Sequence, residues 1–273
     1  MPVDINAGVV SNVRLSDDYN VLTLAAPAIG EQTQPGQFVM VKAALPADSL
    51  LRRPFSVFEV LRDNGRVTAI SIFNKRAGRN TQALYTLEPG ERVACLGPLG
   101  KPFSPTAHDA WMVAGGVGLA PFATLAERLA QSAAKTTLFY GARRAGELFY
   151  LDFFERLGIT LVLSTEDGSR GARGRITAPL ESALASLSTR DQVMIYACGP
   201  EPMLEAVARL AVKYRQPSEV SVERVMGCGL GGCYSCVVPV RNGDGRPHFV
   251  RSCLAGPVFD GATIAWDSHF GID

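Results

Sequence analysis

The sequence predicts an antiparallel β-barrel, then a parallel-sheet α/β domain, and finally a small C-terminal segment. Three observations predict this order. Short apolar runs separated by turn residues fill residues 1–105, strand-like and helix-like runs alternate over residues 106–215, and cysteine and glycine gather in residues 216–273. A chain of 273 residues has room for two domains and a short appended segment.

The predicted barrel rests on six strand-like runs. Each is rich in apolar and β-branched residues, and Gly, Pro, Asn or Asp separates it from the next. The runs are VVSNVRL, NVLTLAAP, QFVMVKA, FSVFEVL, RVTAISIFNK and ERVACLG. Among them, the stretch TQALYTL has a helical pattern, so we expect one short helix in the barrel domain.

The second region alternates strand-like and helix-like runs, which is typical of a parallel sheet with crossover helices. The expected strands are AWMVAGG, TTLFYGAR, TLVLSTED and QVMIYACGP. The expected helices are PFATLAERLAQSAA, ELFYLDFFERLG, APLESALASL and PMLEAVARLAVKYR. After them, the pieces CVVPVRN and PHFVRSC are expected to form short strands around a cysteine-rich loop.

Composition excludes some classes of partner. The 27 basic and 26 acidic residues nearly balance, so no overall field favours nucleic acid or an anionic membrane surface. The amino terminus has no basic start followed by an apolar core, and we expect a cytoplasmic protein. In a reducing compartment, the six cysteines are expected to be metal ligands, redox groups or core residues such as Cys95, rather than disulfides.

Four cysteines have the spacing of an iron–sulfur site. Cys228, Cys233 and Cys236 follow the pattern C-x4-C-x2-C, and Cys253 comes after a further 16 residues. This is the plant-type [2Fe–2S] spacing, and the glycines between the cysteines suit a backbone that wraps a cluster. Structural zinc is the alternative, although zinc sites usually pair cysteines as two close C-x2-C hairpins. The pattern therefore favours a [2Fe–2S] cluster.

Two glycine turns at expected strand ends indicate a dinucleotide site. Gly115, Gly116 and Gly118 precede an apolar helix, where a pyrophosphate can approach the backbone. Gly199 follows another strand, and ligands of open parallel sheets bind beyond such strand ends. An ordinary tight turn is the alternative for the first motif. Cys198 is the candidate catalytic residue beside a nicotinamide ring, and a small buried thiol is its alternative.

The end of a third expected strand bears on cofactor preference. Glu166 and Asp167 are candidates for binding a ribose diol, as acidic residues do in NAD sites. Arg170 and Arg173 lie close by and are candidates for a 2′-phosphate. We therefore predict NAD with Glu166 as its ligand, and NADP remains the alternative.

A third set of residues lies in the predicted barrel. The stretch LRRPFSVF carries two arginines, a proline and an aromatic residue, which can bind a pyrophosphate and pack against a ring system. The amide groups at the start of the short helix, near Asn80 and Thr81, can complete a phosphate site. A solvated sheet edge is the alternative to a flavin site.

Taken in order, these sets resemble the ferredoxin-NADP reductase superfamily, in which a flavin-binding barrel precedes a nicotinamide-binding α/β domain. The tail, ERVMGCGLGGCYSCVVPV with RSCLAGPVFDG, is similar to that of the electron-transfer subunits of two-subunit, NAD-linked dihydroorotate dehydrogenases. The resemblance covers nearly the whole chain. It implies that FAD is bound by Arg53, Pro54, Phe55, Ser56, Phe73, Asn74, Lys75, Gly78, Asn80 and Thr81.

The sequence departs from the family pattern at two positions of the flavin site, and the resemblance also implies a function. The family commonly has Gly where Asn80 stands and often a basic residue where Asn74 stands. The implied cluster ligands are Cys228, Cys233, Cys236 and Cys253. The implied partner is a catalytic, FMN-containing dihydroorotate dehydrogenase subunit in a heterotetramer. Electrons would pass from it through the [2Fe–2S] cluster and FAD to NAD⁺, in pyrimidine biosynthesis, because a flavin exchanges electrons both in pairs and singly.

Two alternatives remain at this point. Relatives with similar tails serve as flavin and iron–sulfur subunits of cytosolic hydrogenases or of NADH-dependent ferredoxin-NADP reductases. A regulatory module with a zinc site and a degenerate nucleotide fold is the alternative without enzymatic activity. The identity of the bound metal separates this last class from the other two.

Overall fold

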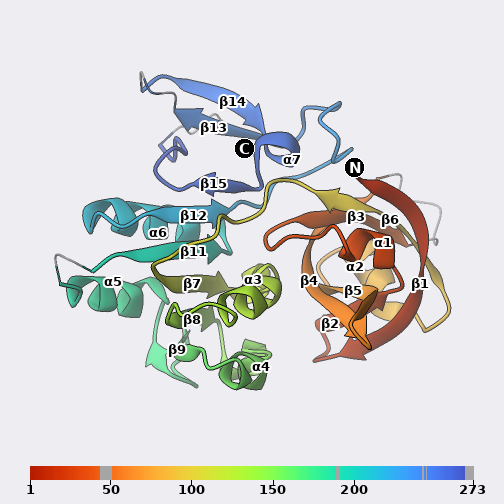
Figure 1. Ribbon diagram of the computed structural model, residues 1–273, viewed down its shortest axis with the longest axis horizontal. Coiled ribbons are helices and arrows are strands. Elements are labelled where there is room, and N and C mark those ends of the chain that lie inside the picture. Colours follow the sequence, from red (N-terminus) through yellow and green to blue (C-terminus); the bar gives the residue numbers. More distant parts are fainter. Residues whose placement is uncertain (44–50, 189–190, 242, 244, 268–273) are drawn as a thin grey trace.

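Six antiparallel strands close a barrel in the first part of the chain (Figure 1). The computed structural model describes residues 1–43, 51–188, 191–241, 243 and 245–267. Around the barrel the strands follow the order β1-β2-β5-β4-β3-β6. Their bounds are β1 (Val3–Arg14), β2 (Tyr19–Leu24), β3 (Phe38–Ala43), β4 (Arg53–Asp63), β5 (Arg66–Lys75) and β6 (Arg92–Leu99). Each overlaps one of the six predicted runs, so the predicted barrel is confirmed.

The barrel closes around an apolar core. Leu22, Val39 and Ile70 are fully buried in it, and so is Cys95, as predicted for a core thiol. The predicted short helix is α2 (Arg79–Thr86), which packs Leu84 into the same core. A further four-residue helix, α1 (Pro27–Gly30), was not predicted from the sequence.

A seven-stranded sheet forms the second part of the molecule (Figure 1). Its order is β10-β9-β8-β7-β11-β12-β15, and only β15 runs antiparallel to its neighbour. The bounds are β7 (Asp109–Gly115), β8 (Thr136–Ala142), β9 (Thr160–Thr165), β10 (Ala172–Arg173), β11 (Val193–Cys198), β12 (Ser218–Ser221) and β15 (Val258–Asp260). The four predicted strands are β7, β8, β9 and β11, and they are adjacent in the sheet.

Helices cover both faces of this sheet, because side chains alternate along each strand. Met112 of β7 faces α3 (Phe122–Leu129) and α4 (Leu151–Arg156), whereas Val113 faces α5 (Thr177–Ala185) and α6 (Glu201–Lys213). Short 3₁₀ helices, η1 (Gly116–Leu119) and η2 (Ala145–Glu147), follow β7 and β8. In Figure 1, α3 and α4 lie on the side of the sheet nearer the barrel. No helix in the described ranges is long and apolar enough to span a membrane.

Aromatic rings join the barrel to the α/β domain. Phe149, just before α4, lies 5.0 Å from the ring centroid of Tyr19 and 5.8 Å from that of Phe73. Its neighbour Tyr150 meets Phe58 edge to face, with ring centroids 4.7 Å apart. Ring pairs at these separations contribute beyond the burial of their area, so this aromatic seam holds the two domains in one arrangement.

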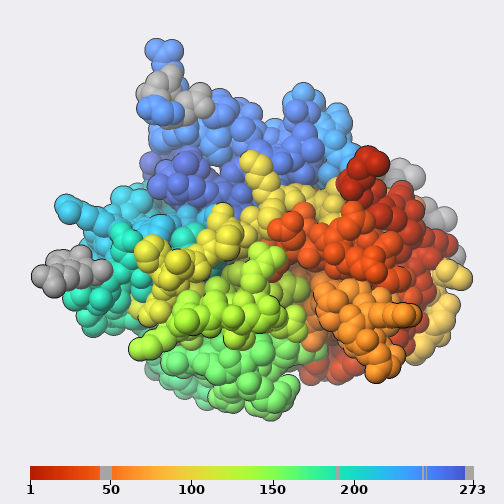
Figure 2. Space-filling model, in the orientation of Figure 1, coloured from red at the N-terminus to blue at the C-terminus, as the bar shows by residue number. Residues whose placement is uncertain are grey.

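The C-terminal segment completes the sheet and then leaves it. Strands β12 and β15 both lie beyond residue 215, so the sheet extends across the predicted boundary between the second and third regions. Between them come the cysteine loop, the hairpin of β13 (Val237–Arg241) and β14 (Pro247–Arg251), and α7 (Ser252–Ala255). In Figure 2 this blue segment forms a lobe that projects above both domains.

Candidate functional site

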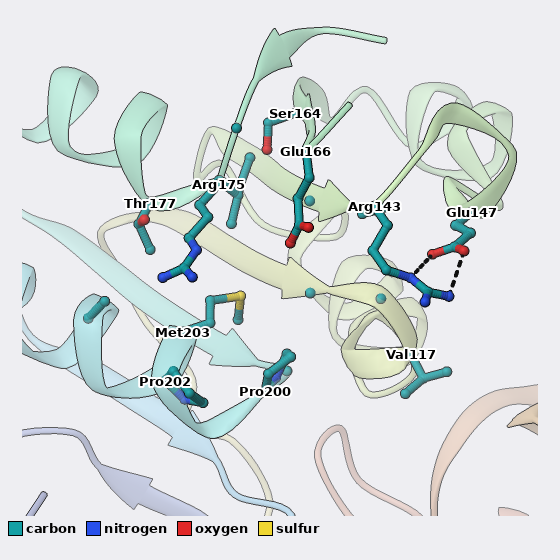
Figure 3. A pocket seen from close by; sticks show the side chains of 18 of the residues that line it. Val117, Arg143, Glu147, Ser164, Glu166, Arg175, Thr177, Pro200, Pro202 and Met203 are labelled. Atoms are coloured by element: carbon teal, nitrogen blue, oxygen red, sulfur yellow. Dashed lines mark hydrogen bonds and ion pairs between the residues drawn. The ribbon is translucent and has the colours of Figure 1, made fainter. Parts of the chain in front are cut away.

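A cavity of about 530 Å³ opens where strands β7, β8, β9 and β11 end (Figure 3). Its volume is in the range of ligand sites, and the ends of parallel strands are where such sheets bind ligands. Gly115, Gly116 and Gly199 line it, so the two glycine turns border one space, as the sequence suggested. From the barrel side, Tyr19 and Lys75 also line the cavity, which therefore lies between the two domains.

The glycines are required because the two turns press against each other. A Cβ atom on Gly199 would lie 3.0 Å from the backbone nitrogen of Gly115, and φ of Gly199 is +154°. A Cβ atom on Gly118 would lie 2.1 Å from the carbonyl oxygen of Cys198. Gly118 is not among the described residues that line the cavity. Its role in the structure is to let η1 pass close to the end of β11.

Charged side chains reach the cavity from three strand ends. Arg143 donates from Nε and Nη2 to the carboxylate of Glu147, over 3.1 and 2.8 Å (Figure 3). The Glu147 side chain is only 6% exposed, so this bidentate pair fixes the orientation of the arginine. Glu166, a predicted ligand, extends into the cavity together with Arg175 (Figure 3).

Cys198 lies beside the cavity, one residue before Gly199. Its side chain is buried, and burial raises the pKa of the thiol, with a further contribution from the nearby Glu223 carboxyl. Within the described residues, Cys198 does not line the cavity, whereas Glu223 does. Burial likewise raises the pKa of Glu223 above its ordinary value.

Two neighbouring arginines at the start of β4, Arg52 and Arg53, differ in whether they form an ion pair. Arg52 pairs with Asp4 over 2.8 Å. The exposed Arg53 donates only to backbone carbonyls, those of Leu51 and Arg52, at 3.4 and 3.2 Å, and no ion pair of its guanidinium occurs within the described ranges. The chemistry of Arg53 therefore suits an anionic ligand such as a pyrophosphate.

Around the start of α2, the predicted residues take different positions. Lys75 lies 5.5 Å from the centre of the Tyr19 ring, at the cavity. Phe73 is buried in the aromatic seam, and Asn74 is fully buried with its amide donating to Asn20 and to the carbonyl of Thr81. The family resemblance implied that these three residues contact the flavin; of the three, Lys75 is the one among the described residues that line the cavity.

The four predicted cluster cysteines lie in two pairs. The thiols of Cys228 and Cys233 are within hydrogen-bonding contact, and so are those of Cys236 and Cys253. A [2Fe–2S] cluster takes four cysteines, two on each iron. Over the described ranges, no group of three or more His, Cys, Asp or Glu side chains is arranged to hold one metal ion. Two thiol pairs match the two cysteines that each iron of a [2Fe–2S] cluster takes.

The loop around these thiols supplies polar contacts to sulfur. The backbone N–H of Leu230 donates to Sγ of Cys228 over 3.3 Å. Hydrogen bonds with Ser235 lower the pKa of Cys233 to about 6, and burial raises the pKa of Cys253 to about 12. Cluster ligands bind iron as thiolates, so the hydrogen bonds from Ser235 favour the thiolate form of Cys233 that iron needs.

The cysteine loop packs directly against the barrel. Cys236 and Cys253 share one apolar cluster with Met40 of β3 and Leu99 of β6. Gly229 has φ of +72°, and a Cβ atom there would lie 2.5 Å from Cγ of Met40. The loop can approach β3 this closely because it has glycine at that point.

In the closed barrel, β4 on one side and β1 on the other lie between the strands at the cavity and the strands at the cysteine loop. The pair β2–β5, which carries Tyr19 and Lys75, lies across the barrel from the pair β3–β6, which carries the loop. Strand β4 joins β5 to β3, and its Pro54 is paired directly with Met40. A group bound along residues 53–56 would therefore lie between the two sites.

Comparisons with known proteins agree with this division of the chain. The family model described as an oxidoreductase FAD-binding domain matches residues 6–103, and the oxidoreductase NAD-binding domain matches residues 112–209. The iron-sulfur cluster binding domain of dihydroorotate dehydrogenase B matches residues 223–265. A relative from Bacillus caldolyticus, named the electron transfer subunit of NAD(+)-dependent dihydroorotate dehydrogenase B, is 37% identical over 87% of this chain and 89% of its own. The chain belongs to this electron transfer subunit family.

Other members of the dihydroorotate dehydrogenase B electron transfer subunit family extend the match. The relative from Geobacillus thermodenitrificans is 36% identical over 92% of this chain and 94% of its own. Among solved structures, an NADH-dependent reduced ferredoxin-NADP oxidoreductase aligns with a TM-score of 0.82 and 26% identity, over 96% of this chain and 91% of that one. The ferredoxin reductase of carbazole 1,9a-dioxygenase, at 23% identity and a TM-score of 0.67, covers 79% of this chain and 67% of its own and shares the fold.

Membership in this family confirms the expected cofactors. The chain is an oxidoreductase subunit with domains for FAD, NAD and a [2Fe–2S] cluster. Sequence reasoning missed Tyr19, Arg143, Arg175 and Glu223 in the cavity wall. Arg175 lies only two positions after the predicted Arg173, and neither Arg170 nor Arg173 is among the described residues that line the cavity. The several arginines of this loop could have indicated that one of them reaches the cavity, but the sequence does not show which one.

Proposed function

We propose that this chain receives electrons from a catalytic subunit that oxidises dihydroorotate and delivers them to NAD⁺. The observation that carries the proposal is the position of β4 between the nucleotide cavity on one barrel wall and the cysteine loop on the other. FAD, when bound, supplies the conversion between paired electrons at nicotinamide and single electrons at the cluster. The chain's contribution is to hold the three groups in that order.

The FAD site is proposed along β4 and the first turn of α2. Arg53 binds the pyrophosphate, because its guanidinium has no acidic partner in the described ranges. Pro54, Phe55 and Ser56 continue along the same strand toward the ring. The turn at Gly78 leads into the start of α2, where Asn80 and Thr81 carry the backbone N–H groups that open a helix.

NAD⁺ is proposed to bind in the cavity between the domains. The turns at Gly115, Gly116 and Gly199 let its pyrophosphate approach the backbone. The carboxylate of Glu166 accepts hydrogen bonds from a ribose diol and repels a 2′-phosphate. Cys198 is proposed to lie beside the nicotinamide as a neutral thiol, because burial raises its pKa and keeps the proton on sulfur.

The partner is proposed to dock over the cysteine loop. Large apolar side chains are exposed around it: Val225 is 81% exposed, Tyr234 63% and Leu230 57%, with Leu254 close to Gly231. Apolar groups gathered around one site are typical of an interaction surface. We propose that an FMN-containing catalytic subunit covers them, in a heterotetramer, which brings its flavin near the cluster.

Copurification followed by an activity measurement tests the proposal. The complex with a dihydroorotate-oxidising FMN subunit is expected to reduce NAD⁺ when dihydroorotate is added without oxygen, and each separated subunit is expected to fail. The variant Tyr234→Asp should weaken assembly while leaving the flavin and iron content of this chain unchanged. A stable complex that reduces NAD⁺ without iron in this chain would contradict the route.

One observation favours a second candidate function. The ferredoxin-NADP oxidoreductase structure covers 96% of this chain, including the cysteine segment. A role beside another flavoprotein, exchanging electrons between NADH and a ferredoxin, is therefore the alternative. Reduced ferredoxin should then drive NAD⁺ reduction by the native complex, and dihydroorotate should not.

A further inference from the structure

We propose that three asparagines, Asn12, Asn20 and Asn74, act as positioning residues that hold α2 so that its first turn faces the FAD pyrophosphate. We call this set the asparagine relay. The inference rests on the proposed FAD site at that turn. It assigns to Asn74 a role through α2, in place of the direct flavin contact that the family resemblance implied.

The relay is a continuous chain of side-chain amides across three barrel strands. Nδ2 of Asn74 donates to Oδ1 of Asn20 over 2.7 Å, and Nδ2 of Asn20 donates to Oδ1 of Asn12 over 2.6 Å. Asn20 and Asn74 stand directly opposite each other in the register of β2 and β5, and both are fully buried. Most polar side chains buried this deeply have at least one hydrogen-bond partner, and each of these two amides donates to one.

Both ends of the relay contact α2. At its first turn, Nδ2 of Asn74 also donates to the carbonyl of Thr81 over 3.0 Å. At its C-terminal end, Nδ2 of Asn12 approaches the carbonyls of Leu84, Tyr85 and Leu87, at 3.2, 3.1 and 2.8 Å. The relay thus joins the two ends of this eight-residue helix to the barrel wall.

The carbonyls at both ends fix the direction of every amide in the relay. A carbonyl only accepts, so Asn12 and Asn74 must both present their NH₂ groups to α2. Asn12 then offers its oxygen to Asn20, and Asn20 offers its own oxygen to Asn74. This leaves Oδ1 of Asn74 as the one relay atom without a partner in the described ranges. Aspartate or leucine could not replace these residues, because neither side chain donates.

The helix depends on such contacts for its orientation. Two helical turns are too short to be stable alone, and Leu84 is the buried residue of α2. At the first turn, the hydroxyl of Thr81 accepts from the N–H groups of Ala77 and Gly78 and donates to the carbonyl of Gly78. The Thr81 side chain is therefore engaged within the turn that precedes the helix.

Flavins of different length separate this role from a general effect on folding. FAD carries a pyrophosphate, whereas riboflavin has the same ring without phosphate. In Asn12→Ala of the full chain, the FAD Kd is expected to rise about tenfold, because the lost hydrogen bonds free the helix that faces the pyrophosphate. The riboflavin Kd should change less than about twofold, since β4 is untouched. The exposed Asn6 on the same strand supplies the control variant Asn6→Ala.

Titration of the flavin-depleted chain, followed by flavin fluorescence, measures both constants. An equal rise in the two Kd values, or no rise in either, would overturn the relay. If Asn12→Ala does not fold, Asn12→Gln keeps the amide but displaces α2, and it must show the same FAD-selective loss. Failure of the FAD site itself looks different, because the wild-type chain would then bind FAD no more tightly than riboflavin.

Discussion

At the scale of single residues, Arg52 and Arg53 are neighbours with different partners. Arg53→Ala is expected to weaken FAD binding about tenfold to a hundredfold, because a charged hydrogen bond contributes about 1.5 to 3 kcal/mol. Arg52→Ala is the matched control, since Arg52 is paired with Asp4. Calorimetric titration of FAD into the flavin-depleted chain measures the difference. Equal losses in the two variants would mean that the phosphate is bound elsewhere.

Glu166 and Asp167 offer a second matched pair. Glu166→Gln is expected to raise the KM for NADH about tenfold and to narrow its preference over NADPH, since a charged acceptor for the ribose is lost. Asp167 bonds instead to the N–H and hydroxyl of Ser169, so Asp167→Asn should leave both constants unchanged. Steady-state reduction of a small dye provides the measurement. An unchanged KM for NADH in Glu166→Gln would show that this carboxylate does not bind the ribose.

Some site residues were predictable and others were not, for a physical reason. Gly115, Gly199 and Glu166 were found from the sequence because parallel topology brings strand ends to one edge. Arg175 and Glu223 lie in irregular segments, where tertiary packing decides which way a side chain points. Cavity residues from the barrel, such as Tyr19, depend on how the two domains meet, which no local pattern records.

At the scale of elements, the cysteine loop depends on its contact with β3. Gly229→Ala is expected to lower the iron content of the purified chain by more than about half, because the new methyl group meets Met40 and a positive φ costs about 1 kcal/mol or more. Gly232→Ala is the control, since a Cβ atom there meets nothing within 4 Å. Iron and acid-labile sulfide analysis checks the result. Full cluster content in Gly229→Ala would show that the loop does not need this approach.

Helices and strands with a strong hydrophobic pattern were predicted from the sequence, whereas short strands that form by pairing with the edge of the sheet were not. The six barrel strands and the alternating strands and helices follow hydrophobic period and turn residues. Strands β12 and β15 have four and three residues, too few to show a period. They form because the edge of the sheet has unpaired backbone N–H and C=O groups. Which segment pairs with that edge depends on the tertiary structure and not on a local pattern.

At the scale of the whole molecule, the cavity between the domains and the cysteine loop lie on separate walls of the barrel. Cys233→Ser is expected to abolish the cluster and electron delivery from the partner, while NADH-driven dye reduction through FAD persists. Cys95→Ala, in the barrel core, is the control that should keep the iron. Visible spectra and the two activities measure this separation. Loss of both activities in a folded Cys233→Ser chain would contradict independent sites.

The barrel's strand order has a consequence for turnover. The cavity between the domains and the cysteine loop face opposite walls of the barrel, so the proposed docking of the catalytic subunit over the loop leaves the cavity open to exchange a dinucleotide with solvent. The reduced dinucleotide can then leave without dissociation of the two subunits, so a permanent complex can complete many turnovers.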